Sequence, residues 1–124
     1  MLTQRQQTGR RAEDLAAEYL SARGCEILER NYRRRLGELD LVAREGGVLV
    51  IAEVRTRAHT TFGSAAASVD YRKQRRITRA AQQLLQQRAE LARFPVRFDV
   101  LVVSDLSGPH PRIEWIRHAF EARA

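Results

Sequence analysis

Residues 36–57 read LGELDLVAREGGVLVIAEVRTR and have the pattern of a β-hairpin. Apolar and polar residues alternate over residues 36–42, and a β-branched run follows over residues 48–55. Gly46 and Gly47 suit the centre of a tight turn, because glycine adopts positive φ without steric cost. We therefore expect two antiparallel strands around which the rest of the chain is arranged.

The register of this hairpin brings acidic residues together. It places Asp40 opposite Glu53 and Glu38 opposite Arg55, with Cβ atoms about 5 Å apart. Two carboxylates at that distance repel each other unless a cation lies between them, and Mg²⁺ accepts such a sparse set of oxygen ligands. A solvated sheet face, on which Arg55 or Arg57 neutralises the acids, explains the same pattern and stays open.

The spacing of these residues resembles the PD-(D/E)xK nuclease signature. In that signature an Asp, a second acidic residue and a Lys lie on a hairpin, and here Asp40 precedes Glu53-Val54-Arg55. Arg55 stands where the signature has Lys. Because Lys73 is the one lysine of the chain, a general replacement of Lys by Arg explains this departure without any change of role.

Four motifs more closely resemble a small bacterial family called YraN-like: residues 37–42 (GELDLV), 53–57 (EVRTR), 62–63 (FG) and 97–100 (RFDV). That family is identified as nuclease-like by its similarity to Holliday junction resolvases and restriction endonucleases. The resemblance implies a restriction-endonuclease-like fold and a metal-dependent endonuclease that acts on duplex or branched DNA. Since resolvase-like enzymes cut two strands as dimers, it also suggests a homodimer.

The resemblance also assigns roles to individual residues. Asp40 and Glu53 would hold Mg²⁺ or Mn²⁺, and Arg55 would orient or stabilise the scissile phosphate and the attacking water. Glu13 or Glu38 would assist. Resolvase-like relatives carry a further acidic metal ligand near a glycine-rich helix start, which residues 9–13 (GRRAE) resemble. Acids in a first helical turn also favour the helix dipole, which is a purely structural explanation of Glu13.

Length and composition indicate one soluble domain with a polyanionic partner. The 124 residues suffice for one modest core, so residues 1–124 are expected to form a single nuclease-like domain. The formal net charge of +7 favours binding to nucleic acid. A single cysteine allows no intramolecular disulfide, and no apolar run is long enough to span a membrane. We expect a cytoplasmic protein that does not bind membranes.

Two helices are predicted. The first begins at Thr8 as N-cap and ends near Arg23, with Gly24 after it and residues 1–7 frayed. The second runs from about residue 68 or 70 to residue 92. Its first half, with Arg57 before it, carries the cations expected to bind DNA phosphates: Arg72, Lys73, Arg75, Arg76, Arg79 and Arg57.

Three more strands complete the predicted fold, over residues 25–32, 95–104 and 113–116. The first is followed by Arg33, Arg34 and Arg35, which either reach phosphate or form a solvated turn. Residues 58–67 are expected to form a loop beside the site. The order of elements indicates an α/β protein with a mixed central sheet flanked by helices.

Two other functions stay open on the sequence. The chain could be a catalytically weak or inactive nucleic-acid-binding accessory module, in which Arg55 marks the loss of catalysis. It could also be a structural interaction protein whose basic face meets an acidic partner. Asp99 follows the family pattern, and we expect it to support the fold by pairing with Arg97 or another cation rather than to bind metal. We expect Trp115 to belong to the core or an interface.

Overall fold

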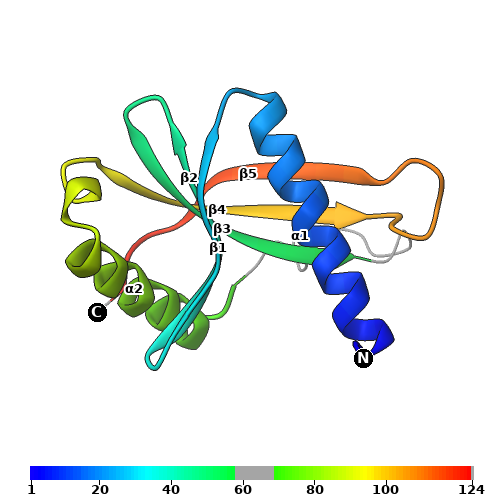
Figure 1. Ribbon diagram of the computed structural model, residues 1–124, viewed down its shortest axis with the longest axis horizontal. Coiled ribbons are helices and arrows are strands. Elements are labelled where there is room, and N and C mark those ends of the chain that lie inside the picture. The colour runs from blue at the N-terminus through cyan, green and yellow to red at the C-terminus, as the bar shows by residue number, and fades with distance from the viewer. Residues whose placement is uncertain (58–68, 124) are drawn as a thin grey trace.

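The fold is a five-stranded sheet with one helix on each side (Figure 1). The computed structural model describes residues 1–57 and 69–123. Its elements are α1 (Gln4–Ala22), β1 (Glu26–Arg34), β2 (Gly37–Glu45), β3 (Val48–Arg57), α2 (Tyr71–Gln87), the 3₁₀ turn η2 (Ala89–Leu91), β4 (Val96–Ser104) and β5 (Arg112–Phe120). The loop predicted over residues 58–67, which includes His59, lies outside the described residues.

The sheet is mixed, with the strand order β1-β2-β3-β4-β5. β3 and β4 pair in parallel, whereas the other neighbours pair antiparallel. A parallel pair needs a long crossover connection, and α2 lies within the one that joins β3 to β4. The predicted α/β class, with a mixed central sheet flanked by helices, is confirmed.

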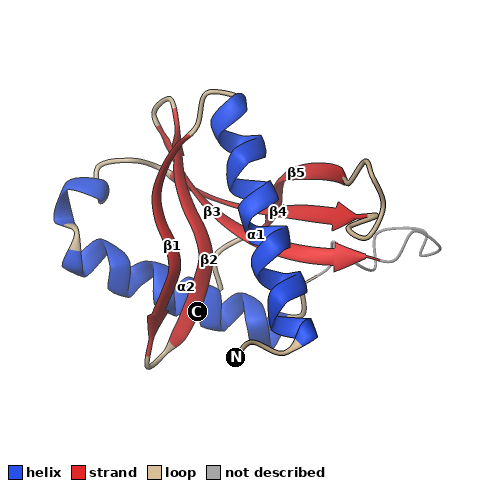
Figure 2. Ribbon diagram, turned by 45° about the vertical axis from the view of Figure 1, so that its right-hand side comes forward, coloured by secondary structure: helices blue, strands red, loops and turns tan. Residues whose placement is uncertain are grey.

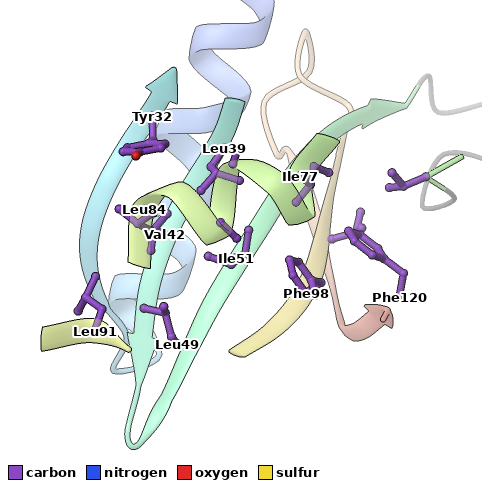
Figure 3. Packing of buried hydrophobic residues seen from close by; sticks show 14 of the residues in the cluster. Tyr32, Leu39, Val42, Leu49, Ile51, Ile77, Leu84, Leu91, Phe98 and Phe120 are labelled. Carbon is purple, nitrogen blue, oxygen red and sulfur yellow. The ribbon is translucent and has the colours of Figure 1, made fainter. Parts of the chain in front are cut away.

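Each face of the sheet buries its own apolar cluster. On one face Ala16 and Leu20 of α1 pack against Leu41, Val50 and Leu101 of the strands. On the other face α2 packs against the alternate strand residues, as Figure 3 shows for Ile77 and Leu84 above Val42 and Ile51. Side chains alternate along a strand, so two buried faces explain why the central strands are almost continuously apolar.

Both predicted helices exist, but their ends differ from the prediction. α1 begins one turn earlier, because Thr3 and Gln6 form a capping box, and residues 4–7 are therefore helical. Thr8 lies inside the helix, where its hydroxyl donates to the carbonyl of Gln4. Gly24 follows the helix with φ +90°, as predicted.

The second helix is capped by Asp70 and ends at Gln87 rather than at residue 92. Arg88 leaves the helical conformation, and η2 then turns the chain so that Leu91 reaches the core. Within the part of the chain that the structure describes, no helix is both long and apolar enough to cross a membrane.

Candidate functional site

The candidate site lies where β2 and β3 separate. The predicted turn and register are confirmed from Glu45↔Val48 to Leu41↔Ala52, where the pairing ends. Beyond this fork β2 continues beside β1, while β3 continues beside β4 (Figure 2). Asp40 lies at the fork, and its Oδ2 accepts a hydrogen bond of 2.9 Å from the backbone N–H of Val54. The carboxylate therefore bonds a strand N–H at the point where the backbone ladder has stopped.

The predicted cross-strand pairs Asp40–Glu53 and Glu38–Arg55 are therefore wrong as backbone pairs. The prediction assumed that the ladder continues beyond Leu41, but twist separates the strands first. Glu38 instead pairs across the other hairpin with Arg33, at 3.4 Å between carboxylate and guanidinium, and both side chains are exposed. The charge of Glu38 also raises the pKa of Asp40, but it is the smallest of the contributions to that pKa.

Glu53 is the buried acid of the site, with 6% of its surface exposed. Its Oε1 lies 2.6 Å from Nζ of Lys73, whose side chain is 44% exposed. Burial and then the charge of Asp40 raise the pKa of Glu53 to about 7, although Lys73 acts in the opposite direction. Glu53 is thus poised to gain or lose a proton, or to exchange its cation, near neutral pH.

Two further acids, Asp40 and Glu13, belong to the same site as the pair formed by Glu53 and Lys73. Burial raises the pKa of Asp40, opposed by the hydrogen bond from Val54 and by one shared with Glu53. Glu13, half-buried on α1, has a raised pKa because of burial and then the charge of Asp40. Asp40 of β2 thus interacts electrostatically with each of the other two predicted metal-site acids, Glu53 of β3 and Glu13 of α1.

Asn31 is a residue of this site that sequence reasoning missed. It has φ +52° in the middle of β1, between the pairs Arg30↔Leu41 and Tyr32↔Leu39, which places it across from Asp40. Its side chain hydrogen-bonds Glu13 and opposes the rise in the pKa of that acid. Asparagine tolerates positive φ better than most residues, so an Asn in a strand pattern was the available signal.

Lys73 is the second residue whose place was not foreseen. It was predicted only as one phosphate-binding cation of the second helix, yet it forms the ion pair with Glu53. Asp70 sets this position, because its carboxylate accepts from the Lys73 N–H at 2.8 Å and so begins the helix there. Its status as the only lysine among 22 Lys and Arg residues was the one sequence signal.

The remaining predicted cations have different environments. Arg55 is half-buried on β3, two residues beyond Glu53 and therefore on the same face. Arg57 lines a separate cavity of about 790 Å³ together with Arg11 of α1. Four arginines of α2 are exposed and form no ion pair within residues 1–57 and 69–123: Arg72, Arg75, Arg76 and Arg79.

The donor set at the fork suits a hard divalent cation. Among the described residues, no three His, Cys, Asp or Glu side chains gather closely enough to hold a metal ion by themselves. The site therefore offers two carboxylates, Asp40 and Glu53, with Glu13 nearby. Mg²⁺ accepts one or two carboxylates and completes its shell with water and phosphate oxygens. Burial is the first cause that raises the pKa of both acids, and for Glu53 the charge of Asp40 is the second, so a bound cation would stabilise their charged forms.

Asp99 is a second buried acid of the sheet, and it has a different environment. Its fully buried carboxylate accepts two bonds of 2.8 Å from Arg97, and further bonds from Trp115 Nε1 and the His118 N–H. The predicted pairing with Arg97 is confirmed. Trp115 is half-buried and packs at its ring edge against Tyr19, as expected of a core residue.

These features define an α/β protein with a restriction-endonuclease-like architecture, in which acids from adjacent strands meet at a fork in the sheet. The chain belongs to the uncharacterised protein family UPF0102, whose family model matches residues 12–103. It is 46% identical to a UPF0102 protein of Stutzerimonas stutzeri strain A1501, over 98% of this chain and 100% of the relative. It is 50% identical to a UPF0102 protein of Methylococcus capsulatus, over 94% of this chain and 92% of the relative. The predicted family resemblance is confirmed.

Proposed function

We propose that the protein is a divalent-metal-dependent endonuclease that hydrolyses phosphodiester bonds in linear or branched DNA. The observation that carries this proposal is the pairing of buried Glu53, whose pKa is raised to about 7, with Asp40 and with the ammonium of Lys73. Strongly perturbed acids at one point are characteristic of catalytic sites. The net charge of +7 favours a polyanionic substrate.

In this proposal each residue of the site has a distinct role. Asp40 and Glu53 hold Mg²⁺ or Mn²⁺, and Glu13 adds negative charge from α1. A bound divalent ion would polarise a phosphate oxygen and offset the charge that develops on it. Lys73 supplies a positive charge beside the same phosphate, which is electrostatic stabilisation of the transition state. The planar guanidinium of Arg55 grips phosphate oxygens and serves as an electrostatic group, not as a general base.

A DNA-binding module without catalysis is the second candidate. Arg72, Arg75, Arg76 and Arg79 favour it, because these exposed cations have no acidic partner among the residues that the structure describes, and such cations bind backbone phosphates without any chemistry. The two candidates differ in one respect that can be measured, which is whether the acid pair binds a divalent ion and cuts.

A cleavage assay with Mg²⁺ or Mn²⁺ on linear and branched DNA tests the proposal, with calorimetric Mn²⁺ titration beside it. We expect metal-dependent cutting by the wild type, and loss of both Mn²⁺ binding and cutting in Asp40→Asn and Glu53→Gln. Glu114→Gln is the matched control, since it neutralises an exposed acid of β5. Equal Mn²⁺ affinity in wild type and Asp40→Asn would contradict the proposed metal site. DNA binding without cutting would favour the second candidate.

The same assay separates the two candidate active-site cations. At saturating DNA, Lys73→Ala should lower the cleavage rate by about a hundredfold, the usual effect of removing one stabilising group from a transition state. Arg55→Ala should lower it less, because Lys73 rather than Arg55 contacts Glu53. If Arg55→Ala is the slower variant, the roles given to these two cations are reversed.

A further inference from the structure

A basic groove lies beside the acid pair, between the β1–β2 turn and α2. Its volume is about 450 Å³. The residues that line it are Arg33, Arg34, Arg35, Gly37, Glu38, Lys73, Arg76 and Ile77. Five cationic side chains thus face one carboxylate, and that carboxylate, Glu38, is already paired with Arg33. The sequence left Arg33–Arg35 open between phosphate contacts and a solvated turn, and it did not place them beside α2.

The walls of the groove are held in place by the fold. A Cβ on Gly37 would lie 2.6 Å from the carbonyl oxygen of Arg76, so only glycine lets the hairpin approach α2 this closely. Arg34 is also fixed, because its guanidinium donates to Gln87 Oε1 and to the Arg33 carbonyl and lies 4.1 Å from the centre of the Tyr32 ring. Hydrogen bonds to neutral groups position this charge without neutralising it, which leaves it available to an anion.

Lys73 connects the groove to the acid pair, which consists of Asp40 and Glu53. Its Nζ contacts Glu53 Oε1, while its side chain lines the groove and remains 44% exposed. Lysine is a compact cation on a flexible four-carbon stem, so its ammonium can change partners without movement of the helix. A phosphate that enters the groove would therefore compete with Glu53 for Lys73.

We propose that this groove binds the backbone phosphates of the DNA strand that leads to the acid pair, and that Lys73 moves from Glu53 to a phosphate when DNA binds. The inference rests on the proposed function only for the identity of the ligand as DNA. Its consequence is that Glu53 loses its ammonium partner only when DNA is in place. The carboxylate then becomes available to a divalent cation at the moment when a phosphate lies beside it.

The groove itself is tested by the salt dependence of binding to a short DNA duplex in EDTA, so that no divalent ion takes part. The double variant Arg35→Ala/Arg76→Ala should bind more weakly, and its slope of log K against log salt should fall by about 1.8, or about 0.9 for each lost phosphate contact. Arg93→Ala/Arg112→Ala is the matched control, because it removes two exposed arginines outside the groove. A wild-type slope in the groove variant, with its fold confirmed by circular dichroism, would overturn the proposal.

The movement of Lys73 is tested by a double-mutant cycle on the same duplex. Glu53→Gln frees the ammonium in advance, so it should raise DNA affinity at least about threefold in the wild-type background and much less in a Lys73→Met background. An equal rise in both backgrounds would mean that Glu53 only repels DNA, and would overturn the exchange.

An RNA duplex of the same sequence checks the ligand class. Tighter, groove-dependent binding of DNA supports the proposal, whereas a groove-dependent slope with RNA alone would overturn the assignment to DNA. Both binding tests work without metal, so their failure is distinguishable from failure of the proposed function, which depends on Mn²⁺ binding and cleavage.

Discussion

Adjacent parallel strands of this protein each bury a carboxylate, and the two acids have opposite environments. Ala52 of β3 pairs with Asp99 of β4, so Asp99 lies one register position from Glu53. Asp99 is fully buried and accepts hydrogen bonds from three residues, including two from the planar guanidinium of Arg97. Glu53 has a flexible ammonium as its charged partner, and burial and then the charge of Asp40 raise its pKa.

This difference distinguishes a structural acid from a candidate functional one. The protein itself satisfies Asp99, and Arg97 extends the network to Glu45, which Arg117 also contacts. The fork leaves Glu53 with an exposed partner that a ligand can replace. Burial of an acid alone therefore does not indicate function. A buried acid indicates function when the protein does not supply enough hydrogen-bond donors and cations to satisfy it.

The largest expected effect is on stability when the satisfied acid is neutralised. Asp99→Asn should lower the free energy of unfolding by about 3–5 kcal/mol, because it breaks a buried ion pair and turns an amide N–H₂ towards donors. Asp40→Asn should change it by less than about 1 kcal/mol, since Asn Oδ1 can still accept from Val54 while charge repulsion falls. Urea denaturation of both variants measures this. Equal losses would show that the fork acid is as structural as Asp99.

A smaller effect is expected from pH. The pKa of Glu53 rises from 4.5 in the unfolded chain to about 7 in the fold, so between these values the folded protein binds more protons. Stability should therefore be highest below pH 4.5 with respect to this group and should fall as pH rises through 7, by up to about 3 kcal/mol. Thermal unfolding at pH 5 and pH 8 tests this, with Glu53→Gln as the variant that should lose this pH dependence. If the stability of Glu53→Gln depends on pH as that of the wild type does, another group is responsible for the pH dependence.

The smallest effect is expected at Glu38, which was predicted to assist catalysis. Its ion pair with Arg33 is exposed on both sides, at 60% and 75% of the side-chain surface. Exposed pairs contribute little because water screens them, so Glu38→Gln should change the free energy of unfolding by less than about 1 kcal/mol. The same urea series measures it. A loss as large as that of Asp99→Asn would mean that the acids cannot be ranked by burial and bonding.

Much of the fold was predictable because its signals are local. The Gly46-Gly47 turn, the alternating strand and the β-branched strand depend on neighbouring residues, and the structure confirms all three. In the first helix only the start was predicted wrongly, because Thr3 and Thr8 are both acceptable N-caps and the hydrogen bond from the Gln6 N–H to Thr3 chooses between them. Local sequence does not decide between two such N-cap positions.

The acids of the site were predictable from the sequence, but the groups that contact these acids were not. Asp40 and Glu53 follow from hairpin spacing, and Glu13 joined them only through the family resemblance. The position where β2 leaves β3 depends on sheet twist, which no short stretch of sequence specifies. That fork gave Asp40 the N–H of Val54 and separated Glu38 from Arg55.

The sequence by itself determined the hairpin, the paired acids, the basic surface and the family. Only the tertiary structure decided that Lys73 meets Glu53 and that the arginines at the β1–β2 turn share a groove with α2. The physical reason is sequence separation. Contacts within a turn or a strand follow from local backbone preference, whereas a contact across twenty residues depends on how whole elements pack, which is decided by the two buried faces of the sheet.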